Sequence, residues 1–594
     1  MNGNSSRTFA SSLLRGESVP VCHGLAGQLQ IRMSLFSKAL PPNAPRVKLL
    51  PGREIDRVNV RHCGVSMTTV PVTNDQSAGP RYQRLRRLAL LATVWIVLLT
   101  LSACVFRAGV QLRHWAWTQT ENMHFQGDAK HAYIWGTYAD RTGLLGTYRQ
   151  IRADYGDEPP QTMGLDYSPL RLTIVTVWAQ WANRHFEDGD QWDPNTSYEF
   201  HRPLLLLNAA CEAAAAVGVV LVLRLMRRIV MANTAGNAGF LNLLREYLPL
   251  AVAALLVWFN PALILNDCWP QWDAWILPCF IFALYFSMRG WWFGAGTLLA
   301  LGAMLKGQIL FVAPAFVLWP LFSMRWLPLA RLVAGFAVAI TLIAIPWMLT
   351  GKGDVLLACA GAAISAALLI VRKGWRRPVF QLLAAAVFVV PVWLTPRIMT
   401  GDLAWFVLPF EYGPIKHTEL STVGTSNLAA LLHEQWGWEG DTPVDLPLPF
   451  GHDLQTDLRT VLVSLYAICL VACAIAAAVQ WRRRDWRFLL AMYAPWVLFF
   501  ALMPYLNNRY LLWASAFFPL LIPLGLGMTL LGGLICLSCC AMLVEIMCRF
   551  NPNSDPTLQS LSRGLYPGLA YLVLLIAAIF LYNAAIFRQS KRPA

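Results

Sequence analysis

Long apolar runs constrain the fold of this chain more than any other feature of its sequence. Runs of about 15–22 mainly apolar residues recur from roughly residue 87 to the C-terminus, close to the length that crosses a membrane's hydrocarbon core. Of the 594 residues, 56% are hydrophobic and 14% are charged, which excludes both a soluble and a disordered protein. We therefore expect an all-α, polytopic transmembrane bundle of about twelve to fourteen spans.

The basic residues predict how these spans are oriented. Arg84, Arg86 and Arg87 precede the first span, and further basic runs at 224–228, 372–377 and 482–487 follow later spans. Because basic residues favour the cytoplasmic side, all of these runs and the N-terminus should lie inside. The net charge of +15 follows this pattern, so we expect no nucleic-acid partner.

Two long stretches between spans are expected outside, at about 107–202 and 396–458. Within the first, 169–183 resembles a short span, but a crossing there would place the Arg224 run outside. We therefore interpret 169–183 as an amphipathic helix that lies in the interface or re-enters, so the external loops should carry interfacial helices.

The chain is expected to divide into three parts. Residues 1–83 read as a disordered cytoplasmic tail, 84–515 as a transmembrane core, and 516–594 as C-terminal helices with a tail. Residues 1–66 should be dispensable, and a start at Met67 is an alternative. The expected spans lie near 88–106, 203–223, 246–265, 274–289, 291–305, 309–323, 329–349, 355–371, 378–395, 459–480, 488–503 and 565–586, with one or two helices in 510–548.

Cysteine and histidine give no strong metal or disulfide signal. Most of the 13 Cys lie in apolar runs, where Cys packs as a small hydrophobic residue, so a disulfide framework is not expected. His and acidic residues in the two external loops permit a divalent metal. No spacing matches a known ligand set, so neither a metal nor another cofactor is required.

Four short polar clusters interrupt the apolar chain, and the predicted orientation places all four outside. They are Gly127-Asp128, 269–273, 306–308 and 507–510. Polar groups at the ends of membrane helices are costly and often mark a site. Each cluster also has a simpler interpretation: Asp128 as a helix cap, 269–273 as a tight turn, and the cations as snorkelling side chains.

Taken together, the clusters predict a reaction site at the membrane surface. A carboxylate such as Asp128 can act as general base toward an acceptor hydroxyl. Lys306 and Arg509 can hold a lipid phosphate, which would compensate for cations on the external side. No nucleotide-binding motif is present, and a sugar donor built on a lipid phosphate needs none.

Through these clusters the sequence resembles the GT-C superfamily of polytopic glycosyltransferases, and is most similar to polyprenol-phosphate-mannose-dependent mannosyltransferases. The resemblance covers roughly 85–515. It rests on an acidic residue in the first loop, a Tyr-Pro-Pro-Leu-like motif, a Trp-Gly-Gln-x-Asp-like turn, a Lys-x-Gln motif and a late Arg-Tyr. Here these are Asp128, 167–170, 269–273, 306–308 and 508–510. The chain differs in having Ser168 for the first Pro, Pro270 for Gly, and Asn507-Asn508 where relatives often carry His-Glu.

The resemblance implies roles for individual residues. Asp128 would be the catalytic base or an acceptor-binding carboxylate, and Lys306 and Arg509 would bind the donor phosphate. The sugar and acceptor would be bound by Asp166, Tyr167, Trp269, Gln271, Asp273, Gln308 and Tyr510.

The expected function is an inverting transfer of mannose or another hexose from a polyprenyl-phosphate donor to a lipid-linked glycan, glycolipid or cell-envelope acceptor. The protein would lie in a bacterial cytoplasmic membrane, among its lipids, with the site facing outside. Two alternatives are a flippase or transporter of a lipid-linked saccharide and a non-catalytic envelope-assembly protein. A transporter typically carries its polar groups near the bilayer midplane in broken helices, often with internal repeats.

Overall fold

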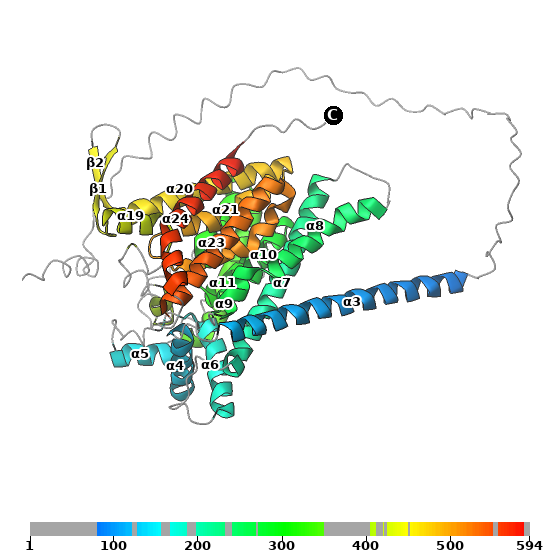
Figure 1. The fold of residues 1–594 in the computed structure, drawn as a ribbon, viewed down its shortest axis with the longest axis horizontal. Helices are drawn as coiled ribbons and strands as arrows, with labels where there is room; N and C mark the ends of the chain where they lie inside the picture. Colours follow the sequence, from blue (N-terminus) through cyan, green and yellow to red (C-terminus); the bar gives the residue numbers. More distant parts are fainter. Residues whose placement is uncertain are drawn as a thin grey trace, which may run out of the picture. The chain divides into compact units, whose positions relative to one another are not determined.

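The computed structural model of the chain describes residues 80–120, 127–155, 165, 167–186, 198–231, 240–268, 271–349, 404–410, 420, 425–448, 452–550 and 556–586. The chain separates into two units, Met1–Arg87 and Leu88–Ala594, and the helical bundle belongs to the second. The described residues are almost entirely helical, which confirms the all-α prediction (Figure 1).

The elements follow one another along the chain with short connections. In order they are α3 Pro80–Gln119, α4 Gly127–Thr142, α5 Thr147–Tyr155, α6 Pro169–His185, α7 Tyr198–Val230, α8 Phe240–Trp258, α9 Pro261–Cys268, η3 Asp273–Trp275, α10 Ile276–Met288, α11 Trp292–Leu305, α12 Ile309–Val312, α13 Pro314–Phe322, α14 Trp326–Leu349, α17 Ala404–Phe410, α19 Leu428–Trp436, β1 Pro443–Leu448, β2 His452–Asp457, α20 Leu458–Arg483, α21 Arg487–Leu502, η4 Asn508–Leu511, α22 Leu512–Phe517, η5 Phe518–Leu524, α23 Leu526–Phe550 and α24 Pro556–Ala585.

Among the described residues, seven helical segments are long and apolar enough to cross a membrane. They are Leu88–Gln119, Tyr198–Val230, Glu246–Cys268, Trp326–Ala344, Leu458–Arg483, Leu526–Arg549 and Gly564–Ala585. Four shorter apolar segments, Asp273–Met288, Trp292–Leu305, Ile309–Phe322 and Arg487–Leu502, coincide with further predicted spans. The protein is thus a multi-pass membrane protein. The spans predicted at 355–371 and 378–395 lie outside the described residues.

One predicted span is broken in the middle. The expected helix 246–265 consists of α8 and α9, which are separated at Asn260. Pro261 cannot donate a backbone hydrogen bond, so the α8 ladder cannot continue through it. The Asn260 side chain instead accepts hydrogen bonds from the N–H groups of Ala262 at 2.9 Å and Leu263 at 3.3 Å, which starts α9.

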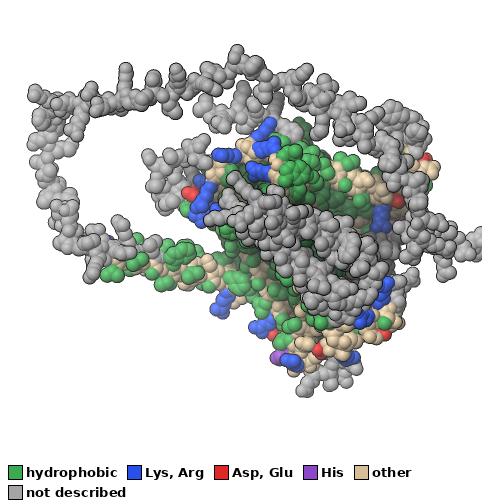
Figure 2. All heavy atoms as spheres, turned by 180° about the vertical axis from the view of Figure 1, so that it is seen from behind, with side chains coloured by type: hydrophobic (Ala, Val, Ile, Leu, Met, Phe, Trp, Pro, Cys, Tyr) green, Lys and Arg blue, Asp and Glu red, His purple; other side chains and the backbone are tan. Residues whose placement is uncertain are grey.

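The first external loop is shorter than predicted at both ends. Helix α3 continues to Gln119, so residues 107–119 are helical, and α7 already begins at Tyr198. The extension is stabilised by Arg113, which forms ion pairs inside the bundle with Glu212 and Asp267. Nearer its start, from Leu88 to Leu101, α3 exposes large apolar side chains, which Figure 2 shows along this helix. Such a surface suits contact with lipid chains.

A tight core surrounds α21, whose residues from Phe488 to Leu502 are all buried. At the Arg487 end of α21, the indole of Trp319 packs against Trp292, Trp481 and Phe488, with ring centroids 4.8–5.2 Å apart. These contacts bring together the start of α11, the end of α13 and the end of α20. The other ends of α11 and α21 therefore lie together, away from the basic run at 482–487.

Helices α4, α5 and α6 form a separate layer at one end of the bundle (Figure 1). Gly136 of α4 lies so close to α6 that a Cβ there would be 2.5 Å from the Val175 carbonyl oxygen. Only a residue without a side chain permits this approach. In the second predicted loop, β1 and β2 form an antiparallel hairpin that pairs Pro443 with Asp457, an element that the sequence patterns did not predict.

Candidate functional site

The four polar clusters meet in space. The Arg509 guanidinium forms an ion pair with Asp128 at 2.5 Å, and Lys306 forms one with Asp273. The Arg509 Nε lies 3.6 Å from the second carboxylate oxygen of Asp273, which links the two pairs. One side chain from each predicted cluster therefore contributes to a single network of four charges, which we call the charge cluster.

Two asparagines position Arg509. The Asn507 side chain accepts the Arg509 N–H at 3.3 Å and so caps the single turn η4. The Asn508 amide donates to the Met542 carbonyl of α23 at 2.9 Å, which fastens that turn to the bundle. The residues that depart from the His-Glu pair of the family pattern thus have a structural role here.

Lys306 and Asp273 are held by the ends of neighbouring helices. Lys306 follows α11 in extended conformation, and its ammonium lies 5.1 Å from the ring centre of Tyr510 and 5.6 Å from that of Trp513. The Trp513 indole donates to the Asp273 carbonyl at 2.9 Å. Gln308 donates to the Tyr510 hydroxyl at 3.2 Å, so this residue pair also borders the cluster.

The charge cluster is formally neutral, because two carboxylates face two cations. Burial by itself raises the pKa of Asp128, but the Arg509 guanidinium, with smaller effects from Gln271 and Lys306, holds that pKa below its ordinary value. Burial lowers the pKa of Arg509, and Asp128 more than compensates, so the net shift is upward. Asp128 is therefore ionised near neutral pH, with 30% of its side chain exposed.

Tyr167 and Trp272 form an aromatic wall beside the cluster. Their ring centres are 6.0 Å apart, and Trp135 meets Tyr167 edge-on at 4.5 Å. Tyr148 donates its hydroxyl to the Tyr167 carbonyl, and Ser168 donates to the Met304 carbonyl near the end of α11. Of the remaining predicted residues, Gln271 is buried next to Trp272, while Asp166 and Trp269 lie outside the described residues.

Sequence reasoning missed Arg171, which lies over this wall. Its guanidinium carbon is 3.4 Å from the ring centre of Tyr167 and 5.3 Å from that of Trp272. The sequence carried a signal, since Arg171 is the only basic residue in the first two turns of the predicted interfacial helix. That helix was expected to serve only as a membrane-surface element.

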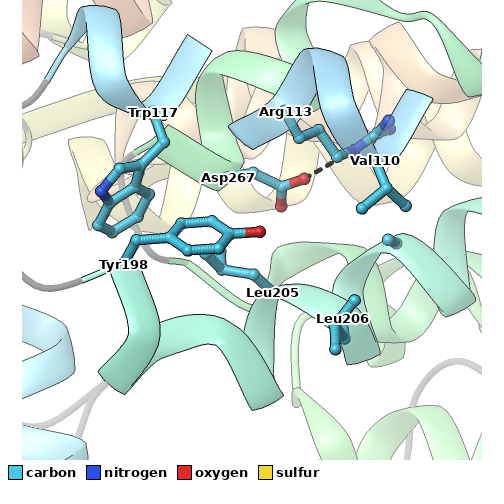
Figure 3. Close-up of a pocket in the computed structure, with 8 residues that line it drawn as sticks. Val110, Arg113, Trp117, Tyr198, Leu205, Leu206 and Asp267 are labelled. Atoms are coloured by element: carbon cyan, nitrogen blue, oxygen red, sulfur yellow. Dashed lines mark hydrogen bonds and ion pairs between the residues drawn. The ribbon is translucent and has the colours of Figure 1, made fainter. Parts of the chain in front are cut away.

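A second buried polar network lies within the spans, and sequence reasoning missed it too. Arg113 of α3 pairs with Glu212 of α7 and, at 2.9 Å, with Asp267 of α9. A small pocket beside Arg113 and Asp267 is lined mainly by apolar and aromatic side chains, including Trp117 and Tyr198 (Figure 3). Charged residues inside apolar runs were the available signal.

This network braces the candidate site from behind. The Asn208 amide donates to Asp267 at 2.8 Å and also to the Gln271 carbonyl at 2.5 Å. The turn that carries Gln271 and Asp273 is therefore tied to α7 and α9.

Within the described residues, no group of three or more His, Cys, Asp or Glu side chains could hold a metal ion. No protein-family model matches the chain, and no curated protein sequence matches it. The chemistry of the site therefore rests on its own geometry: an ionised carboxylate beside two cations, an aromatic wall and a half-open surface.

Proposed function

We propose that the protein is a membrane glycosyltransferase that uses a polyprenyl-phosphate-linked hexose as donor. The observation that carries the proposal is the meeting of Asp128, Asp273, Lys306 and Arg509 in one cluster at the ends of membrane helices. Structural ion pairs need not gather from four distant segments, whereas a site for a charged reaction needs this convergence.

The proposed reaction inverts the sugar's anomeric carbon. An acceptor hydroxyl oxygen attacks that carbon and forms the new glycosidic bond. The bond from the carbon to the phosphate oxygen breaks, and its electron pair leaves with the polyprenyl phosphate. The hydroxyl proton passes to Asp128, which is ionised and partly exposed as a general base must be.

Lys306 and Arg509 act on the leaving phosphate in this proposal. Negative charge grows on that phosphate as the bond breaks, and fixed cations stabilise such charge. Both cations are also paired with carboxylates, so they orient Asp128 and Asp273 as well. Tyr167, Gln271, Gln308 and Tyr510 would border the sugar, with the site on the external face of a bacterial cytoplasmic membrane.

The test is donor consumption by purified protein in lipid. A panel of polyprenyl-phosphate hexoses would be offered together with a glycolipid acceptor, and released polyprenyl phosphate would be measured. The proposal predicts release with at least one donor by the wild type, and little by Asp128→Asn. Equal release by both proteins would rule out the assigned base.

One observation favours a transporter of lipid-linked saccharides as the alternative. The Arg113 network lies within the spans, next to the helix break at Asn260, and transporters carry polar groups at such breaks. A transporter moves its lipid intact, so transfer of uncleaved donor across the bilayer without release of polyprenyl phosphate would decide for this function.

A further inference from the structure

Arg171 is a buried cation without a charged partner. Only 9% of its surface is exposed, yet among the described residues it forms neither an ion pair nor a hydrogen bond, and its Nε is unpaired. Both cations predicted to bind phosphate, Lys306 and Arg509, are matched by carboxylates. Burying an unpaired guanidinium is costly, so an anionic ligand is the simplest compensation.

The neighbours of Arg171 add donors but no acceptor. The indole N–H of Trp272, whose ring lies under the guanidinium, is buried and unpaired. The indole N–H of Trp405, in the same apolar cluster as Tyr167 and Trp272, is also buried and unpaired. Buried donors in proteins are normally satisfied, so three together indicate an acceptor that comes from outside the chain.

The start of α6 points to the same ligand chemistry. Ser168 occupies the N-cap position, but its side chain does not cap the helix, because its hydroxyl donates to Met304 instead. The first-turn N–H groups therefore keep the positive end of a 17-residue helix open to an anion. Side chains tilt toward a helix's N-terminus, and the stacking of Arg171 on Tyr167 shows that its guanidinium does so.

Charge decides which anion suits this place. The charges of Asp128, Asp273, Lys306 and Arg509 cancel, so Arg171 leaves one positive charge beside the cluster. A phosphodiester, in which phosphate joins a lipid alcohol to a sugar, carries one negative charge. It would neutralise Arg171 while leaving both ion pairs intact.

We propose that Arg171, the Trp272 indole and the open N-terminus of α6 form the subsite for the phosphodiester of a polyprenyl-linked sugar. This proposal rests on the proposed function, because it assigns the phosphate position of that donor. Tyr167 connects the subsite to the charge cluster, since its ring contacts Arg171 and its phenol contributes to the raised pKa of Arg509.

Binding without turnover tests the subsite. The probes are a farnesyl phosphate hexose diester, farnesyl phosphate, inorganic phosphate and phosphatidylglycerol, each titrated against the full chain in a maltoside detergent. The diester should bind most tightly. Inorganic phosphate or phosphatidylglycerol binding as tightly as the diester, and with the same dependence on Arg171, would overturn the donor assignment.

Three variants and one control separate charge from packing. Arg171→Gln should weaken diester binding about tenfold or more, as expected for a lost charge-assisted contact. Arg171→Lys should fall between Gln and wild type, and Trp272→Phe, which keeps an aromatic ring, should also weaken binding. Arg184→Gln, at the exposed end of the same helix, should bind as the wild type does.

Two results would contradict the subsite. In the first, Arg171→Gln and Trp272→Phe melt as the wild type does and keep its affinity. In the second, Lys and Gln at position 171 lose affinity equally. Failure of the subsite and failure of the proposed function remain distinguishable: Arg171-dependent binding without sugar transfer sinks only the function, and undiminished transfer by Arg171→Gln sinks only the subsite.

Discussion

Asp128 and Arg509 are 381 positions apart in the sequence, and their side chains form an ion pair at 2.5 Å. The pair joins the start of α4, in the first external loop, to the short turn η4 near the end of the core. Because Arg509 also faces Asp273, closing this pair places the external layer over the helix ends that carry Lys306 and Asp273.

This pair predicts how transfer responds to pH. The pKa of folded Asp128 lies below its ordinary value of 3.8. The stability that the pair contributes is therefore fully present above 3.8 and is lost as pH falls through the lower, folded pKa. Turnover between about pH 5 and 8 should show no acidic limb caused by Asp128. An acidic limb in that range that disappears in Asp128→Asn would contradict the assigned pairing.

The Arg113 network predicts an unequal response to two charge removals. Arg113→Met leaves Glu212 and Asp267 buried without a cation, and breaking such a network costs about 3–5 kcal/mol. Glu212→Gln should be milder, because Asp267 keeps its partner. Thermal unfolding in detergent measures both, with Arg107→Met, on the exposed face of α3, as the control. Equal melting of Arg113→Met and the control would show that the network does not stabilise the fold.

The contact between α4 and α6 predicts a strict requirement for glycine. In Gly136→Ala, the new Cβ would lie 2.5 Å from the Val175 carbonyl oxygen and 2.8 Å from the Ala179 Cβ, so the helices must separate. We expect a loss of about 1–3 kcal/mol of stability and lower turnover, because α4 carries Asp128. Gly568→Ala adds the same methyl group where no atom lies within 4 Å, and should have little effect. Unchanged melting and turnover in Gly136→Ala would contradict the close packing.

The predicted orientation can be tested at the two ends of α20. Asp441 precedes the hairpin that leads into this helix, and Arg483 ends it. In a background without other accessible cysteines, Asp441→Cys should react with an impermeant reagent added outside intact cells, and Arg483→Cys only after permeabilisation. The reverse pattern would place the candidate site on the cytoplasmic side.

Sequence patterns predicted the helices and the members of the charge cluster, because apolar length and isolated polar groups are local signals. Partners could not be read in the same way. Lys306 and Arg509 looked like cations that needed a phosphate, and only the fold shows that Asp273 and Asp128 face them. Arg113 fell in a predicted loop because its helix continues past the apolar run, and the distant residues Glu212 and Asp267 make that continuation favourable.

Turnover of Asp128→Asn, measured against donor concentration, tests the central claim most directly. Asn keeps the size of the side chain and most of its hydrogen bonding, but it cannot take a proton from the acceptor. Turnover should fall about a hundredfold or more, the usual scale for loss of a general base, while the donor concentration at half-maximal rate changes little. A well-folded Asp128→Asn protein with wild-type turnover would contradict the proposed mechanism.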